Sequence, residues 1–541
     1  MLTSPPRCEL DFTPIRDTDD GAWGGFEVRW RAELEPIVAG EIVLQLPEQI
    51  ASVPGVPYRT ADILLADARG SLDLIELAST TDSSGTTRRW AASRDTAGVL
   101  ELALRAPVRI IDPQTPVGPL FDLRAEPLGL FGAGVTFIPL PVSDDVFDVT
   151  LRWHLADGVA AVSSHGLGDQ SWTGPLQTIA YAYYAAGTPR QVMADSGRFG
   201  LHAFSEVPFD LEAIACYIGE LQAVMAAFFD DPDPNYHVFV RRNPGTGSGG
   251  TALPGSFAFG YSPIQQPDAS ELRSLLAHEM AHNWPRLDTG HSEGAWYTEG
   301  TAEYYSHVLP LRAGLLSSAG FAAQLSERIQ GYDINPLRSL DNEAAGDAFW
   351  ADARAQRIPY GRGLRYLIAT ELQIRRATGG ERSLDDVVLD ILAAQRRGER
   401  IGVDGWLERV SALVGEDARV HYDTMRSGGA IEIPDAVFEG CVRPIPAVRC
   451  EFDLGFDLAS FQGEERRVKS LVPESAAAAA GMQEGDRLVE RSLAHHLIRR
   501  SDVPIEIAIM RDGVARRIRY IPSGRTVPTL EWRVVDAEEG Q

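Results

Sequence analysis

The chain has 541 residues, 44% of them hydrophobic and 23% charged, which is typical of a soluble globular protein. Its formal net charge of −26 argues against binding to nucleic acid or to an anionic membrane surface. The length exceeds what one hydrophobic core usually supports, so about three domains are expected. We find no apolar run near the ~18 residues of a membrane helix, and the first residues lack the apolar stretch of a signal peptide. We therefore expect a soluble protein with no transmembrane segment, in either the periplasm or the cytoplasm.

Residues 1–165 are expected to form an N-terminal β-rich domain. Short alternating or apolar runs at 41–46, 99–104 and 147–153 are separated by Gly, Pro and Asp, which favour turns. That spacing is typical of a β-sandwich. We find no motif with catalytic chemistry in this segment.

Residues 166–435 change character, because apolar residues now recur with the 3.6-residue period of helices. The pattern predicts helices over 210–229, 361–378, 383–396 and 403–414, besides two around the motifs described next. We expect a mostly helical domain here, followed by β-rich residues 440–541. The expected fold class is therefore multidomain α+β.

The motif His278-Glu279-Met280-Ala281-His282 predicts a zinc site of the HExxH type. Residues four apart lie on one face of a helix, so both imidazoles can reach one metal ion. Glu279 then projects beside that ion, where its carboxylate can take a proton from the attacking water. The alternative is an ordinary amphipathic helix whose two histidines are surface or core residues.

A catalytic zinc ion needs a third protein ligand, and the next helix offers Glu299. Glu303 lies four residues further on the same helical face, where it can accept the N–H of a liganding histidine and orient it. His291 and Glu293 compete for the third-ligand role, and we expect both on a short link between the two helices. The prediction is one Zn²⁺ per chain on His278, His282 and Glu299.

The C-terminal segment 440–541 resembles a PDZ domain in its order of features. Leu454-Gly455-Phe456 predicts the Gly-Phe loop, followed by a strand, an alanine-rich helix before Gly481, and a Gly485-Asp486 turn. Such domains add an extended peptide as a strand to an exposed sheet edge. The alternative for the alanine run is a plain helix.

Together these motifs resemble the glycyl aminopeptidase family of gluzincin metallopeptidases, which is related to the aminopeptidase N family. The resemblance implies a thermolysin-like zinc peptidase domain between the β-rich N-terminal domain and the PDZ-like domain. The features that carry it are His278-Glu279-x-x-His282-Asn-Trp284, Trp296-x-x-Glu299-Gly300, Tyr360-Gly-Arg-Gly363 and the PDZ-like segment.

The resemblance also implies roles outside the zinc ligands. Tyr360 would donate a hydrogen bond to the oxyanion of the tetrahedral intermediate, with Arg362 in place of the commoner Lys; a packing Tyr at a helix start is the alternative. The family's Gly-rich substrate strand corresponds to Gly249, Gly250, Thr251 and Ala252. In this chain that strand lacks the acid that binds the substrate's free amine. The interval of sixteen residues between His282 and Glu299 is also shorter than usual for the family.

The functional hypothesis is zinc-dependent hydrolysis of peptide bonds, by an aminopeptidase-like exopeptidase of the glycyl aminopeptidase type. One alternative is an endopeptidase without free-amine recognition. Another is a peptide-binding scaffold with a weak zinc site, in which the PDZ-like domain binds the ligand. Four cysteines are too few for a disulfide scaffold. Cys441 and Cys450 close a small loop if the compartment is oxidising, and free thiols in a reducing cytosol are the alternative. The sequence does not indicate an oligomeric state.

Overall fold

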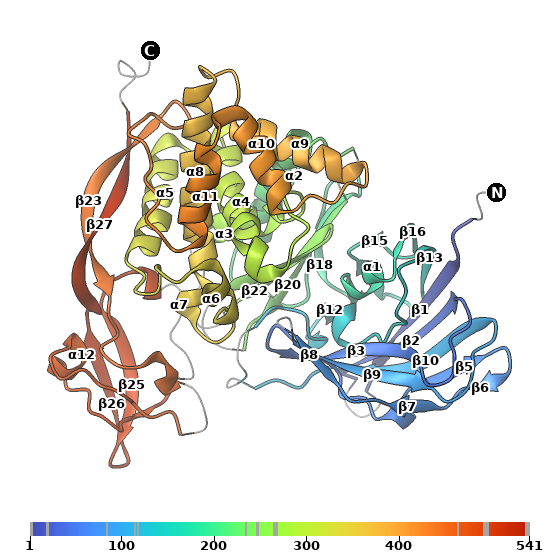
Figure 1. Cartoon of the computed structure of the whole chain (residues 1–541). Helices are drawn as coiled ribbons and strands as arrows, with labels where there is room; N and C mark the ends of the chain where they lie inside the picture. The colour runs from blue at the N-terminus through green and yellow to red at the C-terminus, as the bar shows by residue number, and fades with distance from the viewer. Residues whose placement is uncertain are drawn as a thin grey trace. The chain divides into compact units, whose positions relative to one another are not determined.

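The computed structural model describes residues 4–17, 21–82, 85–112, 115, 118–232, 235–244, 248–262, 269–461, 465–490 and 497–535. The chain divides into two compact units, Met1–Asn283 and Trp284–Gln541 (Figure 1). The boundary falls directly after the His278–His282 motif. The expected α+β fold with several sheets and a helical part is confirmed, whereas the three-domain division at 165 and 440 stays a prediction.

Where the structure describes residues 7–187 of the first unit, their strands form three sheets. Their strand orders are β16-β13-β1-β2-β10-β5-β6, β4-β3-β9-β7 with β8 paired to β9, and β11-β12-β17-β14-β15. The strands and the short helix α1 are β1 Arg7–Arg16, β2 Trp23–Glu33, β3 Ile42–Ile50, β4 Val53–Pro54, β5 Leu64–Asp67, β6 Gly70–Ser71, β7 Leu74–Glu76, β8 Thr80–Asp82, β9 Gly85–Ala92, β10 Val99–Pro107, β11 Arg124–Glu126, β12 Gly129–Ala133, β13 Val146–Trp153, β14 Ala160–Ser163, β15 Gly166–Leu167, β16 Gln170–Pro175, α1 Gln177–Ala180 and β17 Tyr183–Gly187.

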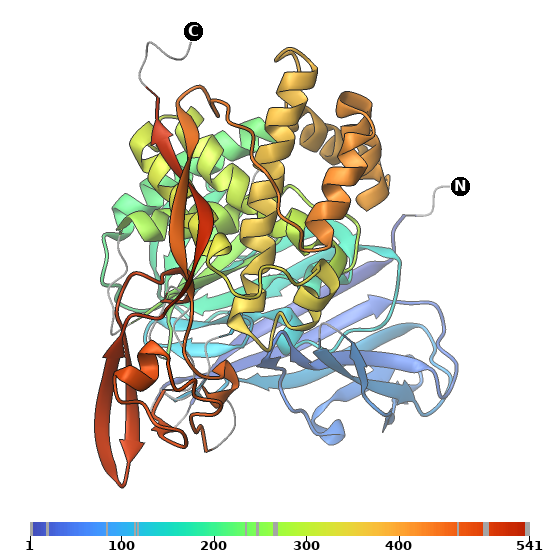
Figure 2. The same ribbon diagram turned by 60° about the vertical axis from the view of Figure 1, so that its left-hand side comes forward.

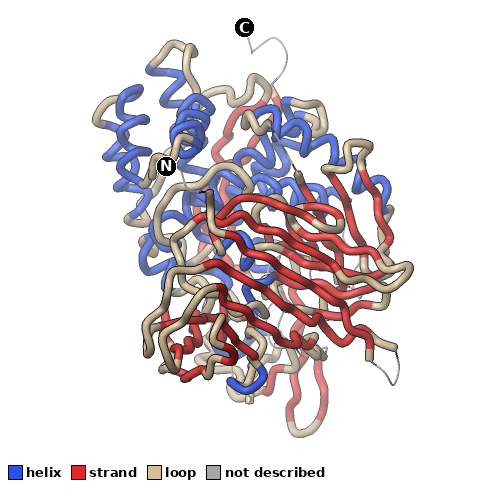
Figure 3. The backbone as a smooth tube through the Cα atoms, turned by 90° about the vertical axis from the view of Figure 1, so that its right-hand side faces the viewer, coloured by secondary structure: helices blue, strands red, loops and turns tan. Residues whose placement is uncertain are grey.

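These sheets share one hydrophobic core, as the sandwich prediction requires. In β2, Phe26, Val28 and Trp30 are buried between exposed charged residues, which is the period-two pattern of a strand with one buried face. Phe12 of β1 stacks on Tyr184 of β17 with ring centroids 4.7 Å apart. The predicted strands at 41–46, 99–104 and 147–153 are confirmed as β3, β10 and β13. Figure 3 shows the long strands of this region, in red, lying side by side.

A further sheet, β18-β19-β20-β22-β21, completes the first unit and carries the zinc-motif helix. It is mixed: β19, β20 and β22 are parallel, and β21 runs antiparallel to β22 at the edge. Helices α2 and α3 pack on it. The bounds are β18 Arg190–Met193, β19 Phe199–Ala203, α2 Leu211–Phe228, β20 Tyr236–Arg242, β21 Gly249–Leu253, β22 Ser256–Tyr261 and α3 Ala269–Ala281.

This sheet corrects the expectation that helices dominate from residue 166 onward. Its strands β19, β20 and β22 are buried on both faces, so their sequences show apolar runs without the alternation that marks a strand. Within the described residues one helix, α2, is long and apolar enough to cross a membrane by length and composition. Its apolar side is buried within the first unit, as in the core helix of a globular protein.

The second unit is helical up to residue 426. Its helices are α4 His291–Arg312, α5 Ser318–Asp333, α6 Asn342–Asp347, α7 Ala353–Gln356, α8 Ile358–Ala377, α9 Leu384–Arg396, α10 Val403–Val414 and α11 Asp417–Arg426. The helices predicted over 361–378, 383–396 and 403–414 are thus confirmed as α8, α9 and α10. The helix predicted over 210–229 is confirmed as α2 of the first unit. Helix α8 begins three residues before its predicted start, because Pro359 fits the first turn, where its missing N–H costs no hydrogen bond.

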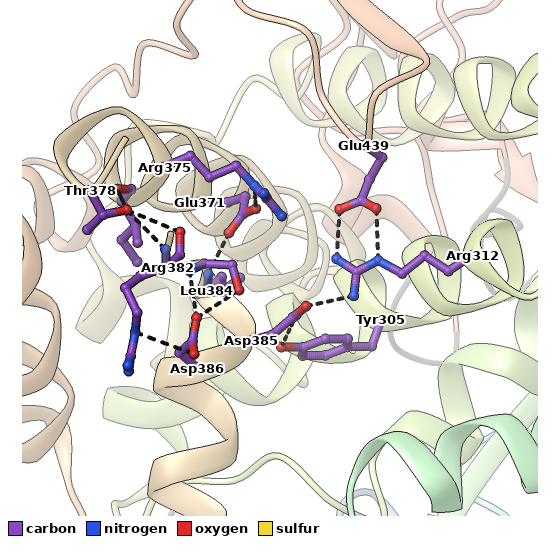
Figure 4. A network of polar contacts seen from close by, with 12 residues as sticks. Tyr305, Arg312, Glu371, Arg375, Thr378, Arg382, Leu384, Asp385, Asp386 and Glu439 are labelled. Carbon is purple, nitrogen blue, oxygen red and sulfur yellow. Dashed lines mark hydrogen bonds and ion pairs between the residues drawn. The ribbon is translucent and has the colours of Figure 1, made fainter. Parts of the chain in front are cut away.

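A polar network ties the C-terminal end of α4 to three other segments (Figure 4). Arg312 of α4 forms an ion pair with Asp385 at 2.7 Å and binds both oxygens of Glu439 at 2.8 Å. The Tyr305 hydroxyl donates to Asp385 at 3.1 Å, and Glu371 of α8 accepts the N–H of Leu384 at 2.5 Å. Helix α4, which carries Glu299 near its other end, is therefore anchored at its far end.

The C-terminal part of the second unit consists of a two-stranded ribbon and a small β-body. The ribbon, β23 Val442–Phe452 and β27 Ser523–Val534, runs along α5 (Figures 1 and 2), where Ser326 and Gln330 hydrogen-bond to β27. The small body holds α12 Ala476–Ala479 and the sheet β24 Arg487–Leu488, β25 Ile505–Arg511 and β26 Val514–Tyr520.

Parts of the C-terminal prediction hold and parts do not. Leu454 and Phe456 are buried in the core of the small body, and Ser475 caps the alanine-rich helix. The strand expected after the Gly-Phe loop is wrong for the described residues, because Leu458–Phe461 forms a 3-10 turn and Arg467 makes only an isolated bridge. A PDZ-like identity thus stays a prediction. Of the two alternatives for Cys441 and Cys450, the structure shows free thiols, since extended β23 separates them by roughly 25 Å.

Candidate metal centre and active site

Helix α3 places His278 and His282 side by side. The helix ends at Ala281, and His282 follows in the next turn while keeping the four-residue spacing. Their Nε2 atoms lie 3.1 Å apart, and the ring planes are nearly perpendicular. The opposite side of the helix is held by buried Leu272 and Met280. The two imidazoles therefore face the same point from one helix.

The Gly-rich strand β21 passes directly beside the proposed catalytic base. A Cβ atom on Gly250 would lie 2.7 Å from Cγ and 2.9 Å from Cδ of Glu279, closer than carbon atoms normally approach. Only glycine therefore lets the strand run this close to the carboxylate. Thr251 fixes the strand from its other side: its hydroxyl accepts the N–H of Leu120 at 2.8 Å, and its carbonyl accepts the hydroxyl of Tyr183 at 3.2 Å.

Asn283 connects the end of the zinc-motif helix to the hairpin that contains β21. Its Oδ1 accepts the N–H of Gly255 at 2.7 Å, and its Nδ2 donates to the Tyr236 hydroxyl at 3.2 Å and to the Met280 carbonyl at 3.0 Å. Gly255 has φ +66°, the left-handed conformation that the hairpin turn requires. Sequence reasoning missed this role, and the only available signal was the position of Asn283 directly after His282.

Two buried tyrosines lie within electrostatic reach of Glu279. Burial raises the pKa of Tyr236 well above 10, and the negative charge of Glu279 raises it further. Burial raises the pKa of Tyr183 too, with Glu279 again contributing in the same direction. Both phenols therefore stay protonated at neutral pH, and they act as hydrogen-bond donors or acceptors rather than as acids.

On α4, Glu299 is partly buried and Glu303 is almost fully buried. Glu303 forms an ion pair with Arg328 of α5 at 3.0 Å, and its carboxylate lies 3.9 Å from Nδ1 of His307. A buried carboxylate needs such partners, because an isolated charge would be costly away from water. The expected hydrogen bond from a liganding histidine to Glu303 stays a prediction.

The structure brings the three predicted ligands together. One ligand atom from each of His278, His282 and Glu299 lies within 4.8 Å of the others, with the rings and the carboxylate partly or fully buried. Two nitrogens about 2.0–2.1 Å from a tetrahedral zinc ion would lie about 3.3 Å apart. The observed Nε2 separation of 3.1 Å is close to that value. Two imidazoles with a carboxylate are also a donor set typical of catalytic zinc, so the residues fit the ion.

The two alternative candidates for the third zinc ligand lie on helix α4 and not on a link between helices. His291 and Glu293 form the first turn of α4, which begins directly after Gly290, so their placement on a link is wrong. An acid at this position interacts favourably with the helix N-terminus, which explains why the helix starts so early. The His291 ring packs edge-on against Phe349 with centroids 4.7 Å apart. Neither residue belongs to the ligand group above.

The motif glycines bring α4 and α8 into close contact. A Cβ atom on Gly300 would lie 2.6 Å from Cα of Gly363, and one on Gly363 would lie 2.0 Å from the Trp296 carbonyl. Tyr360 is partly buried in the first turn of α8, one turn before this crossing. The Arg357 guanidinium lies 5.0 Å from the centre of its ring, a cation–π contact. The crossing thus fixes the segment that carries Tyr360 against the helix that carries Glu299.

Comparison with known families agrees with the sequence motifs. A family model described as M61 glycyl aminopeptidase matches residues 287–356, a segment that includes Glu299 and Glu303. The resemblance to glycyl aminopeptidases is thereby confirmed. Among curated proteins, none matches the chain by sequence.

Solved structures share the fold. An aminopeptidase N family protein from Idiomarina loihiensis has a TM-score of 0.67 and 13% identity, over 97% of this chain and 98% of that one. A mutant of an M1 zinc metallopeptidase from Deinococcus radiodurans has a TM-score of 0.51 and 16% identity, over 80% and 96%. Native yeast LTA4 hydrolase has a TM-score of 0.50 and 13% identity, over 80% and 69%. The fold is therefore that of aminopeptidase N-like proteins.

Proposed function

We propose that this chain is a zinc-dependent peptidase that hydrolyses bonds in peptide or protein substrates. The observation that carries the proposal is the donor group of His278, His282 and Glu299, with Glu279 on the helix that bears His278. The match to glycyl aminopeptidases and the aminopeptidase N-like fold support it. One zinc ion per chain on these three side chains would polarise the scissile carbonyl and lower the pKa of the attacking water.

Glu279 is the general base in this proposal. Its carboxylate accepts a proton from the attacking water and later delivers a proton to the leaving amine. The carboxylate lies against the backbone of β21 at Gly250, so a substrate aligned along that strand would pass beside the proton acceptor. Gly249, Gly250, Thr251 and Ala252 would hold an extended substrate through main-chain hydrogen bonds, as an added strand at the sheet edge.

Tyr360 is the proposed donor to the oxyanion that forms on the scissile carbonyl. Removal of one such donor typically costs about 10²–10³ in kcat, because the hydrogen bond strengthens as negative charge develops. Glu303 is the proposed support of the centre, where it accepts the N–H of a liganding histidine and holds its tautomer. The ion pair of Glu303 with Arg328 favours the ionised carboxylate that this role needs.

We further propose an aminopeptidase-like exopeptidase of the glycyl aminopeptidase type. The strand Gly249–Leu253 carries no acid to bind a free α-amine, so an endopeptidase is the rival proposal. The two differ in one measurable respect, because only an aminopeptidase requires the free amine. Comparing kcat/KM for the free and the N-acetylated form of one peptide separates them: selective loss on acetylation supports the exopeptidase, and equal rates support the endopeptidase.

The peptidase proposal is tested by metal analysis together with cleavage of a mixed peptide library. Purified protein should contain about one zinc per chain, because a three-ligand site with an open position binds one ion. Products read by mass spectrometry should disappear with a chelator and return on addition of Zn²⁺. Bound zinc without any cleavage would favour the scaffold alternative. Protein that neither contains nor takes up zinc would contradict the proposal.

Residues 440–541 are proposed to form a PDZ-like domain that binds a peptide ligand. The buried Gly-Phe loop, the Ser475-capped alanine helix and the three-stranded sheet support this assignment. Gly455 has φ +81°, and a Cβ atom there would lie 2.7 Å from Oγ of Ser475, so Gly455→Val should distort the loop. Peptide-library capture by the full chain should fall in this variant while its zinc content stays unchanged. Equal capture by both proteins would contradict the assignment.

A further inference from the structure

The N-terminal part of α8, residues 358–363, is fixed on three sides, and Tyr360 lies on the fourth. Successive residues of a helix point about 100° apart, so Tyr360, Gly361, Arg362 and Gly363 face four directions. A Cβ atom on Gly361 would lie 2.4 Å from Cβ of Tyr332 on α5, and Gly363 touches α4. The third side of this N-terminal part is held by Arg362.

Arg362 is fully buried and donates hydrogen bonds to the segment that leads from α5 into α6. Its Nη1 donates to Oδ1 of Asn342 at 2.7 Å, and its Nη2 donates to the carbonyl oxygens of Arg338 at 2.8 Å and of Leu340. Its Nε lies 3.4 Å from the Tyr332 hydroxyl. A planar guanidinium reaches acceptors spread in this way, whereas the single ammonium of a lysine does not.

The acceptors of Arg362 are neutral, although a buried cation is usually costly unless a carboxylate compensates it. A gain in stability therefore does not explain why an arginine occupies this position. The arrangement of its hydrogen bonds explains it better. The segment it holds is itself fixed, because Arg338 forms an ion pair with Glu451 of β23 at 2.7 Å and the Ile334 carbonyl accepts the N–H of Phe452 at 2.9 Å. Arg362 thus ties the start of α8 to a rigid support.

We propose that Arg362 is a positioning residue, which orients the Tyr360 hydroxyl by fixing the first turn of α8. This inference rests on the proposed function, in which Tyr360 donates to the oxyanion. It explains the whole Tyr360-Gly-Arg-Gly363 motif: the two glycines permit close packing against α5 and α4, the arginine sets the direction of the turn, and the tyrosine acts on the substrate.

A double-mutant cycle on the zinc-loaded full chain tests the proposal. We expect Tyr360→Phe to lower kcat by about 10²–10³ and Arg362→Lys to lower it by about 10–10², as for a small misplacement of a catalytic group. In the Tyr360→Phe background, Arg362→Lys should cost no more than about twofold, because the group it positions is gone. Zinc content and melting temperature are measured for every variant.

The matched control is Arg365→Lys, three residues further along α8. Arg365 binds both oxygens of Asp333 at 2.9 and 3.0 Å and the Ile431 carbonyl at 2.6 Å, so its replacement disturbs α8 to a similar extent. Its effect on kcat should be the same factor with and without Tyr360→Phe, within about twofold. Coupling of Arg365 to Tyr360 as strong as that of Arg362 would show a general structural effect and overturn the proposal.

Other results of the double-mutant cycle also test whether Arg362 acts through Tyr360. An equal loss from Arg362→Lys in both backgrounds would refute a role through Tyr360. Full kcat in Tyr360→Phe would refute the positioning proposal as well, while chelator-sensitive cleavage would leave the zinc peptidase proposal standing. If Arg362→Lys folds poorly or loses zinc, Asn342→Ala removes one acceptor of the Arg362 hydrogen bonds. That variant should show the same direction of coupling to Tyr360→Phe, and strict additivity would overturn the inference.

Discussion

Substitution of Gly250 by alanine should impair catalysis without loss of zinc. The added Cβ would lie 2.7 Å from Cγ and 2.9 Å from Cδ of Glu279, whereas ordinary contact begins near 3.4 Å. Relief of that overlap requires a relative movement of about 0.5–0.7 Å between strand and carboxylate, and misplacement by 1 Å can cost about 10²-fold. We therefore expect kcat to fall about 10- to 10²-fold, which corresponds to about 1.4–2.7 kcal/mol of transition-state stabilisation.

The assay compares kcat, zinc content and melting temperature of the wild type with those of Gly250→Ala and Gly249→Ala. A Cβ atom on Gly249 meets no atom within 4 Å, so the loss in Gly249→Ala should be clearly smaller. Zinc should stay bound in both variants, because neither contact involves a ligand. Equal kcat values for the two variants, or loss of zinc from Gly250→Ala alone, would refute the reasoning that β21 is fitted to Glu279.

Three further predictions follow from the packing and the charges. Gly300→Ala should destabilise the protein by about 1–3 kcal/mol in urea unfolding, because its Cβ would overlap Gly363; an unchanged midpoint would contradict the close crossing. Asn283→Ala, which removes the bond to Gly255, should raise KM by a larger factor than the factor by which it lowers zinc occupancy. An unaltered KM would contradict the link to β21. Burial alone would raise the pKa of Asp122, but three arginines hold it at about 2. Because this pKa lies below the unfolded value, Asp122→Asn should destabilise the protein by about 2 kcal/mol at pH 7, and the difference should shrink from pH 4 towards pH 2; a difference independent of pH would contradict it.

Local features of the sequence predicted the helices and pointed to His278, His282 and Glu299, whose donor atoms lie together in the structure. Helix α2 begins at its predicted position because the Asp210 side chain accepts the N–H of Ala213 and caps it. His278 and His282 could be paired from spacing alone, since helical geometry places residues four apart together. Glu299 could be proposed because catalytic zinc requires a third ligand and the next helix supplies a carboxylate.

The rest depended on contacts between residues far apart in the sequence. Strands β19, β20 and β22 are buried on both faces, so neither alternation nor length separated them from helical segments. The bond between Leu120 and Thr251 joins residues 131 positions apart, and no local pattern announces it. The hydrogen bonds of Arg362 to the segment before α6 could not be predicted either, because every residue has a backbone carbonyl and no residue type marks the acceptor.

Two incorrect predictions also arose because contacts in the folded protein outweighed a local sequence pattern. The sequence predicts a link at His291 and Glu293 because the nearby Gly290 favours a turn, whereas in the structure Gly290 is the residue directly before α4. The strand expected after Leu454-Gly455-Phe456 rests on the PDZ resemblance alone. Packing of Leu458–Phe461 as a 3-10 turn in the small C-terminal core took precedence over that pattern.

The most direct test of the account is the activity and zinc content of Glu279→Gln. The substitution keeps the size of the side chain and leaves His278, His282 and Glu299 intact, so zinc should stay at about one per chain. Cleavage of the best library peptide should fall by about 10²–10⁴, because a general base contributes that much. Full activity in zinc-loaded Glu279→Gln would contradict the central claim that this helix supplies both the metal ligands and the base of a peptidase.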